Sequence, residues 1–249
     1  MRGTLDALTS PLWKIDYETR NTRTPFTLHR NCLGKAFAVI SDRHPTSNPK
    51  DFNERVPRPP KCGQLHLILG PMFSGKSTEL LRLVERYEVE GNSVLVVKSA
   101  LDERYGVDSV VTHDGKTRDC VALPSLQRLE EHVSQQDLAQ YQVIAIDEAQ
   151  FFSDLVEFCL EAAEKRGQTV IVAGLSGDFR RLPFGQIPNI SALADTVTKL
   201  SARCSRCNEP AHFSLRTVVD ADTTLVGGSE MYAPACRTCY NALNIHSRE

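Results

Sequence analysis

Residues 64–78, QLHLILGPMFSGKST, predict a buried strand, a glycine-rich turn and the first turn of a helix. Residues 65–69 form an apolar run of strand length, and residues 70–77 match the pattern G-x-x-x-x-G-K-[ST]. Glycines let such a turn point its backbone N–H groups inward, while the lysine adds a cation and the serine a hydroxyl for Mg²⁺. A helical pattern follows over residues 79–90. We therefore expect this stretch to hold the phosphates of a nucleotide.

The composition is that of a soluble globular protein, with 249 residues, 41% hydrophobic and 24% charged residues. A chain of this length is expected to form one main domain with appendages. Its formal net charge of -2 provides no broad basic field, so we expect no nucleic-acid partner. No apolar run is long enough to predict a membrane span, so we expect no membrane partner.

The first 60 residues have no sustained hydrophobic period and end in a proline-rich stretch, so they predict a poorly ordered N-terminal extension. Basic residues outnumber acidic ones in this extension, which suggests import into a mitochondrion or plastid as an alternative. Asp6, Asp16 and Glu18 are atypical of transit peptides, which are poor in acidic residues. The expected location is therefore the cytoplasm.

Strands and helices alternate along the middle of the chain. Apolar runs predict strands at residues 93–98, 141–146, 169–173 and 194–200, and helical patterns lie at residues 79–90, 123–133 and 154–166. Asp114-Gly115 predicts a hairpin beside them. This alternation is typical of right-handed crossovers and a parallel sheet. We therefore predict an α/β fold of the P-loop (RecA-like) type, with a parallel sheet flanked by helices, over residues 61–202.

Charged residues follow two of these strands, where open α/β sheets bind their ligands. Asp102, Glu103 and Arg104 lie just past the predicted strand at residues 93–98. Arg104 could reach the phosphates or form an ordinary surface ion pair. Asp147 and Glu148 end the predicted strand at residues 141–146, which we expect to lie next to the strand at residues 65–69 in the sheet. Such an acidic pair beside a phosphate loop predicts that Asp147 holds the metal and Glu148 faces the reacting group, although a solvated carboxylate pair is the simpler reading.

Two aromatic residues, Phe179 and Phe184, follow the predicted strand at residues 169–173. Aromatic side chains at this position usually serve ordinary packing. Because both come just past the end of a sheet strand, they could instead flank a planar ligand.

Four cysteines near the C-terminus, Cys204, Cys207, Cys236 and Cys239, form two C-x-x-C pairs separated by a β-like stretch. This spacing predicts a closed, structural Zn²⁺ site in a small sub-domain at residues 203–249, with a redox pair as the alternative. Paired spacing in an enzyme-like chain indicates metal binding rather than disulfides. The glycines near residue 227 could bring the intervening loop close to a substrate.

The motifs together resemble a known family. The resemblance to the cellular, zinc-containing type of thymidine kinase covers residues 62–240. It rests on the cysteine pairs and on ILGPMFSGKSTEL at 68–80, LDERY at 101–105, IDEAQFF at 146–152 and TVIVAGLSGDF at 169–179. It implies transfer of the ATP γ-phosphoryl to the 5′-hydroxyl of thymidine or deoxyuridine with Mg²⁺, in deoxynucleotide salvage, usually by a homotetramer. A zinc ribbon with a lasso loop over the substrate would complete the fold.

The resemblance also implies roles for individual residues. Glu148 would be the general base that takes the proton of the 5′-hydroxyl, and Ser77 and Asp147 would hold Mg²⁺. The ATP site would comprise Gly70, Pro71, Met72, Phe73, Ser74, Gly75, Lys76, Ser77, Asp102, Glu103, Arg104, Asp147 and Gln150. The thymidine site would comprise Met72, Phe151, Leu175, Phe179, Ser214, Thr223, Thr224, Leu225, Val226, Gly227 and Tyr232. Ser176 departs from the family pattern, which usually has Asp there, so any charge-dependent contact at this position is lost or replaced.

Two other functions compete with this interpretation. A nucleic-acid-dependent ATPase is the first, because residues 147–150 also resemble a helicase box and zinc ribbons often contact nucleic acid. A helicase normally needs a second RecA-like core, for which this chain lacks the length, and a basic groove, for which it lacks the charge. The second is a nucleotide-sensing scaffold that binds ATP without consuming it.

Overall fold

The computed structural model describes residues 27–30, 36–39, 62–102, 109–111, 117–218 and 227–244. The chain divides into a unit at residues 1–58 and a unit at residues 59–249, and each is considered by itself. In the first unit, strands β1 (Thr27–Arg30) and β2 (Ala36–Val39) pair antiparallel. The sequence analysis did not predict this pairing, and the rest of the expected N-terminal extension lies outside the described residues.

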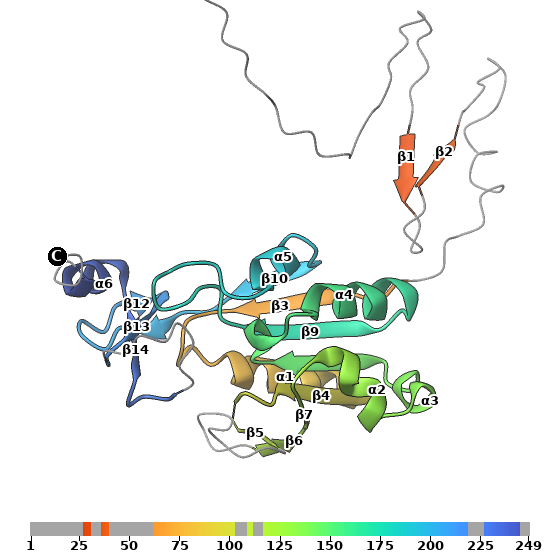
Figure 1. Ribbon diagram of the computed structural model, residues 1–249, viewed down its shortest axis with the longest axis horizontal. Helices are drawn as coiled ribbons and strands as arrows, with labels where there is room; N and C mark the ends of the chain where they lie inside the picture. The colour runs from red at the N-terminus through yellow and green to blue at the C-terminus, as the bar shows by residue number, and fades with distance from the viewer. Residues whose placement is uncertain are drawn as a thin grey trace, which may run out of the picture. The chain divides into compact units, whose positions relative to one another are not determined.

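A six-stranded sheet organises the second unit (Figure 1). Its strand order is β10-β3-β9-β8-β4-β7, and every adjacent pair is parallel. The strands are β3 (Leu65–Leu69), β4 (Val94–Ser99), β7 (Val121–Leu123), β8 (Val143–Asp147), β9 (Thr169–Gly174) and β10 (Thr196–Lys199). This arrangement confirms the predicted α/β class with a parallel sheet flanked by helices.

Side chains alternate between the two faces of the sheet, as the period of a strand requires. On one face, α1 (Lys76–Val89) packs its buried leucines and Val84 onto Ile68, Ala145 and Ile171. The other face, which includes Leu67, is covered by α4 (Leu155–Leu160) and α5 (Ile187–Ser191). Helices therefore cover both faces, and the four inner strands β3, β9, β8 and β4 read as nearly continuous apolar runs because both of their sides are buried.

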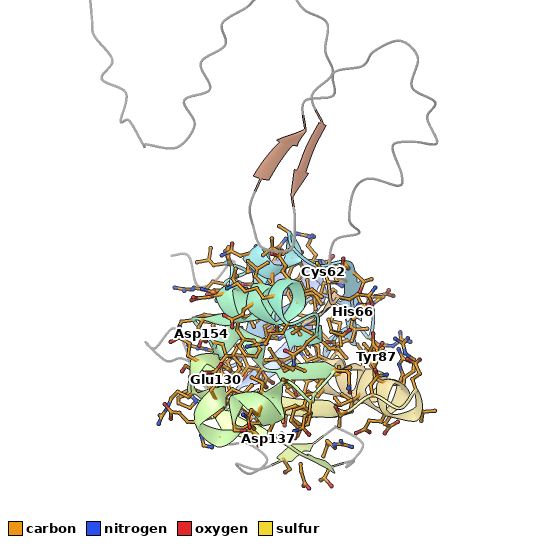
Figure 2. The ribbon with its side chains drawn as sticks, turned by 90° about the vertical axis from the view of Figure 1, so that its right-hand side faces the viewer. Cys62, His66, Tyr87, Glu130, Asp137 and Asp154 are labelled. Carbon is orange, nitrogen blue, oxygen red and sulfur yellow. The ribbon has the colours of Figure 1, made fainter. Side chains whose placement is uncertain are left out.

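Helix α1 is also joined to the sheet near the start of β3. His66 Nε2 lies 3.1 Å from Tyr87 Oη, and Figure 2 shows the two labelled side chains next to each other. His66 Nδ1 lies 2.7 Å from Thr196 Oγ1 on the edge strand β10. Burial lowers the pKa of His66, so its neutral form is favoured. The neutral imidazole thus links β3, α1 and β10 by hydrogen bonds.

The segment after β4 differs from the prediction of one helix at residues 123–133. It contains β7, a 3-10 helix at Leu126–Arg128, α2 (Leu129–His132) and α3 (Gln135–Leu138). Leu123, Leu126 and Leu129 are all buried, but they are spread over an edge strand and two short turns of helix. The spacing of these leucines fits the buried face of one helix, and it fits a strand followed by two short helical turns equally well. The spacing indicates only that the leucines are buried, not which secondary structure carries them.

The predicted hairpin is present as β5 (Ser109–Val111) paired antiparallel with β6 (Thr117–Asp119). Its expected turn at Asp114-Gly115 lies outside the described residues. Arg118 of β6 forms an ion pair with Glu88 of α1, which attaches the hairpin to the main domain.

Short strands and one helix form the C-terminal part of the chain. They are β11 (Ala202–Arg203), β12 (Pro210–Ala211), β13 (Phe213–Arg216), β14 (Tyr232–Ala235) and α6 (Arg237–Asn244). Figure 1 places this cluster beyond the carboxyl end of β3. Among the described residues, no helix has the length and apolar character needed to cross a membrane.

Candidate active site

The turn at residues 70–77 joins the end of β3 to the start of α1. Gly75, which precedes the helix, has a φ of 80°, a left-handed conformation that glycine adopts without strain. A Cβ on Gly70 would lie 2.2 Å from Ser74 Oγ, so a larger residue at this position would force the Ser74 side chain to move. Lys76 is buried, and its Nζ donates a hydrogen bond to the Pro71 carbonyl at 2.9 Å. The loop therefore curls around its own lysine, with the helix N-terminus beside it.

The turn meets the end of β8 through a side-chain contact. Ser77 Oγ donates a hydrogen bond to Asp147 Oδ2 at 2.7 Å. The strands that carry these residues are not neighbours, because β9 lies between β3 and β8. The expectation that the loop and the acidic pair leave adjacent strands is therefore wrong. The contact still forms because α1 packs across β9 and β8, on the face toward which Ala145 and, two residues later, Asp147 point.

Asp147 is buried, and its pKa is raised to about 6. The main cause is desolvation by burial, and the second is repulsion from the neighbouring Glu148 carboxylate. The Ser77 hydrogen bond and the Lys76 charge act in the opposite direction. An ionised carboxylate in this position is costly until a cation neutralises it. The hydroxyl of Ser77 and the carboxylate of Asp147 are the oxygen ligands that Mg²⁺ prefers, so the residues present fit this ion.

Glu148 follows Asp147 at the strand end, with φ 50° and ψ 39°. A non-glycine residue in this left-handed region carries backbone strain, which accumulates at functional sites. Gln150, only 3% exposed, donates from its Nε2 to Glu148 Oε2 at 2.5 Å, and its Oε1 accepts the Leu175 N–H at 3.0 Å. Because a backbone N–H can only donate, it fixes which end of the amide faces Glu148. Glu148 is thus held by a donor of known orientation.

Beside this acidic pair lies an apolar cluster built from several distant segments. Met72, Leu175 and Tyr232 form its buried centre, with Phe179, Phe184 and Met231 packed against them. The Met72 N–H donates to Ser214 Oγ at 3.0 Å, which joins the turn after β3 to β13. The ring of Phe151 meets that of Phe184 edge to face at a centroid distance of 5.7 Å. The structure therefore brings together the predicted Met72, Phe151, Leu175, Phe179, Ser214 and Tyr232.

Several members of this cluster were missing from the predicted site. Phe184 was noted in the sequence as a residue that could flank a planar ligand but was not assigned to the thymidine site, and Met231 had no signal of its own. Arg216 was also missed, although its guanidinium carbon lies 3.9 Å from the centroid of the Phe179 ring. The position of Phe184 shortly after a strand end did indicate a possible ligand contact, whereas Arg216 depends on pairing between β13 and β14 that the sequence does not reveal.

Part of the predicted site cannot be placed. Glu103, Arg104, Thr223, Thr224, Leu225 and Val226 lie outside the described residues. Asp102 is buried just after β4, and its N–H donates to the Ser99 carbonyl at 3.1 Å. Gly227 is buried, and a Cβ there would lie 2.5 Å from Met231 Sδ. The glycine thus allows the end of the predicted loop to pack closely against the residue next to Tyr232.

The four C-terminal cysteines come together as predicted. Their sulfur atoms all lie within 4.8 Å of one another, and Cys207 Sγ is 3.6 Å from Cys236 Sγ. A tetrahedral Zn²⁺ with Zn–S bonds of about 2.3 Å separates its sulfurs by about 3.8 Å, so the four thiols fit this ion. Asn208, at a φ of 62°, donates its N–H to the Cys204 carbonyl at 2.9 Å and closes the first knuckle.

The thiols of Cys204 and Cys239 differ in pKa. The backbone N–H of Cys236 lowers the pKa of Cys204 to about 6, whereas hydrogen bonds with the Cys207 and Cys236 side chains raise that of Cys239 to about 12. A bound cation would displace the protons of the four thiols, because the deprotonated thiolate is the form that binds metal. Outside this quartet, Cys62 is disulfide-bonded, which the sequence analysis did not predict.

The geometry defines a class of protein before any comparison. A glycine-rich turn at a helix N-terminus, a carboxylate pair in contact with it and an apolar cluster beside both are the parts that phosphoryl transfer requires. The chain is accordingly placed among the kinases.

Comparison with known proteins gives the particular family. The family model for thymidine kinase matches residues 63–240. "Thymidine kinase a" of Arabidopsis thaliana is 50% identical over 178 residues, which cover 72% of this chain and 75% of the relative. "Thymidine kinase" of Oryza sativa subsp. japonica is 47% identical, covering 74% of this chain and 68% of the relative. "Thymidine kinase, cytosolic" of Homo sapiens is 47% identical, covering 72% and 73%. The chain belongs to the thymidine kinase family.

Proposed function

We propose that this chain transfers the γ-phosphoryl group of ATP to the 5′-hydroxyl of thymidine, and of deoxyuridine, in deoxynucleotide salvage. The observation that carries the proposal is the double contact of the turn at residues 70–77. Its Ser77 meets Asp147 at the acidic strand end, and its Met72 belongs to the apolar cluster. One short loop thus adjoins both a place for phosphates and a place for a planar base, as transfer between two aligned substrates requires.

At the phosphate end, the backbone N–H groups of residues 70–77 and the Lys76 ammonium would bind the ATP phosphates. Ser77 and Asp147 would hold Mg²⁺, which when bound neutralises charge on the phosphate oxygens. Asp102, Glu103, Arg104 and Gln150 are proposed to complete this site, on the family resemblance. These groups position ATP and stabilise charge, which is most of what phosphoryl transfer asks of a protein.

At the reacting hydroxyl, Glu148 is proposed as the general base. Its carboxylate would accept the proton of the 5′-hydroxyl while the oxygen attacks the γ-phosphorus, and the bond between that phosphorus and the β–γ bridging oxygen breaks. The Gln150 amide donates to Glu148 Oε2, so it would hold the carboxylate in one orientation at the end of β8. Gln150 would thus set the direction in which the base faces.

At the nucleoside end, Phe151, Phe179 and Tyr232 are proposed to enclose the pyrimidine, while Met72 and Leu175 face the thymine methyl group. Ser214 would lie near the same methyl group, and residues 223–227 would contact the base through backbone groups. Apolar contact with one methyl group is worth only about 1 to 3 kcal/mol. Deoxyuridine, which lacks it, is therefore expected to remain a substrate with a higher KM.

A nucleoside panel tests this function directly. Purified full-length protein is incubated with ATP, Mg²⁺ and each of the common deoxynucleosides, and nucleoside monophosphate is measured. We expect thymidine and deoxyuridine to be phosphorylated and purine deoxynucleosides to be excluded by size. ATP hydrolysis that responds to single-stranded DNA and not to thymidine would instead support a nucleic-acid-dependent ATPase. Nucleotide binding without turnover would indicate a sensing scaffold.

Loss of one zinc-binding thiol provides a separate test of the cysteine site. The Cys236→Ser variant is expected to purify with much less than one zinc per chain and to become sensitive to proteolysis near residues 204–239, because a closed site stabilises a sub-domain that has little core. Metal analysis and limited proteolysis measure both effects. Cys120→Ser, outside the quartet, is the matched control and should retain its zinc. A zinc-free wild-type protein with the same resistance to proteolysis would contradict a structural metal.

The organisation of the whole protein follows the same resemblance. We propose a nucleotide-binding domain at residues 61–202, a zinc-binding sub-domain with a substrate-covering loop at residues 203–249, and an extension at residues 1–60. A homotetramer is proposed for the assembled enzyme on the family resemblance alone, and a cytoplasmic location is supported by the human relative named cytosolic. Light scattering of the purified protein would contradict this assembly if it gave a mass other than that of four chains.

A further inference from the structure

Helix α6, in the cysteine sub-domain, is bonded to the loop that follows β9. Tyr240 lies next to Cys239 in α6, and its hydroxyl donates a hydrogen bond to the Phe179 carbonyl at 2.5 Å. Tyr240 is only 4% exposed, and the hydrogen bond itself is partly buried. A side chain adjacent to a zinc-binding thiol therefore holds the backbone of a residue in the apolar cluster.

The ring of Tyr240 is in contact with two other side chains. The Arg181 guanidinium carbon lies 4.3 Å from its centroid, and the Phe213 ring lies 5.6 Å away, centroid to centroid. Arg181 Nη1 also donates to Asn241 Oδ1 at 3.1 Å, one residue further along α6. The hydroxyl of Tyr240 thus has little freedom to leave the Phe179 carbonyl.

The loop that carries Phe179 is itself folded as a unit. Asp178 Oδ1 accepts hydrogen bonds from the N–H groups of Arg180 at 2.9 Å and Leu182 at 2.8 Å. Asp178 also donates its own N–H to the Leu182 carbonyl at 2.9 Å. A displacement of the Phe179 carbonyl would therefore move the whole turn and the Phe179 ring with it.

The Phe179 ring has a second attachment to the same sub-domain. Arg216 of β13 stacks on it, with its guanidinium carbon 3.9 Å from the ring centroid, and donates from Nη2 to the Tyr232 hydroxyl at 3.0 Å. Tyr240 thus holds the backbone of Phe179, while Arg216 holds its ring beside Tyr232. Both anchors come from the part of the chain that the cysteines stabilise.

We propose that Tyr240 is a positioning residue, through which the cysteine sub-domain sets the place of Phe179 and hence the affinity for the nucleoside. The inference rests on the proposed function, since Phe179 is assigned there to the pyrimidine site. Tyr240 does not touch the substrate itself. Its hydroxyl acts through the Phe179 carbonyl, so its loss affects binding of the base and leaves the phosphate end at residues 70–77 in place.

The Tyr240→Phe variant of the full-length zinc-loaded enzyme tests this role, because it removes a single hydroxyl and keeps the ring. We expect the KM for thymidine to rise about tenfold, the loss expected for one partly buried hydrogen bond to a carbonyl that then lacks this donor. The kcat, the KM for ATP and the zinc content should stay within about twofold of wild type. Tyr141→Phe is the control, and its KM for thymidine should not change.

The outcomes separate the inference from the function on which it rests. A wild-type enzyme that fails to phosphorylate thymidine refutes the proposed function, whatever Tyr240 does. An active wild type with an unchanged thymidine KM in Tyr240→Phe overturns the positioning role, and so does an equal rise in both KM values. If Tyr240→Phe fails to fold, Arg216→Lys tests the second anchor, because lysine keeps the charge but loses the planar stacking. That variant must also raise the thymidine KM selectively, or the inference fails.

Discussion

Replacing Glu148 with glutamine is expected to lower the kcat for thymidine phosphorylation by about 10² to 10⁴-fold, the range found when a general base is lost. Glutamine keeps the size of the side chain, but its amide cannot accept the proton of the attacking hydroxyl. The left-handed backbone at this position, with φ 50°, is equally available to glutamine, so the fold should survive. Binding of both substrates depends on other residues, and the KM values should change little.

Steady-state kinetics with thymidine and ATP measure this effect, and the temperature of unfolding checks the fold. Glu157→Gln, an exposed position in α4, is the matched control and should have wild-type kinetics. Near-normal turnover by a folded Glu148→Gln enzyme would remove Glu148 from the role of base. It would also leave the hydrogen bond from Gln150 without a catalytic purpose.

The contact between Ser77 and Asp147 illustrates what the sequence reveals and what it conceals. The strand, the turn and the acidic pair could each be predicted, because apolar runs, glycines and strand-end charges are local signals. The insertion of β9 between β3 and β8 could not, since strand order depends on contacts between distant segments. The two ends meet nonetheless, because α1 spans the intervening strand.

The nucleoside end depends still more on tertiary structure. Cys204, Cys207, Cys236 and Cys239 were predictable as a group, because each C-x-x-C pair marks itself in the sequence. Met72, Ser214 and Tyr232 have no such local signal and entered the prediction only through resemblance to a family. Neither a local sequence signal nor the family resemblance indicated Arg216 and Tyr240, because their roles arise from stacking and hydrogen bonding across separate segments. Residues that act through other residues are thus the ones that sequence motifs miss.

Replacing Lys76 with methionine is expected to lower kcat/KM for ATP by about 10² to 10³-fold, comparable to the loss of one preorganised donor in a charge-stabilising site. Lys76 is 8% exposed and lies at the N-terminus of α1, where its Nζ donates to the Pro71 carbonyl. When ATP binds, this ammonium is expected to turn to the phosphates, whose negative charge rises as the bond breaks. Methionine fills a similar volume without charge, so the packing of the loop should persist.

The same substitution should act on Asp147 and not on the nucleoside site. The Lys76 charge is one of the influences that lower the pKa of Asp147, so its removal should raise that pKa further. The KM for thymidine should stay near the wild-type value, because Lys76 and the apolar cluster contact different parts of the substrates. Isothermal titration with Mg-ATP and steady-state kinetics measure the two effects, with exposed Lys165→Met as the control. Wild-type affinity for Mg-ATP together with wild-type kcat in a folded Lys76→Met enzyme would contradict a phosphate site in this turn, whatever the role of Glu148.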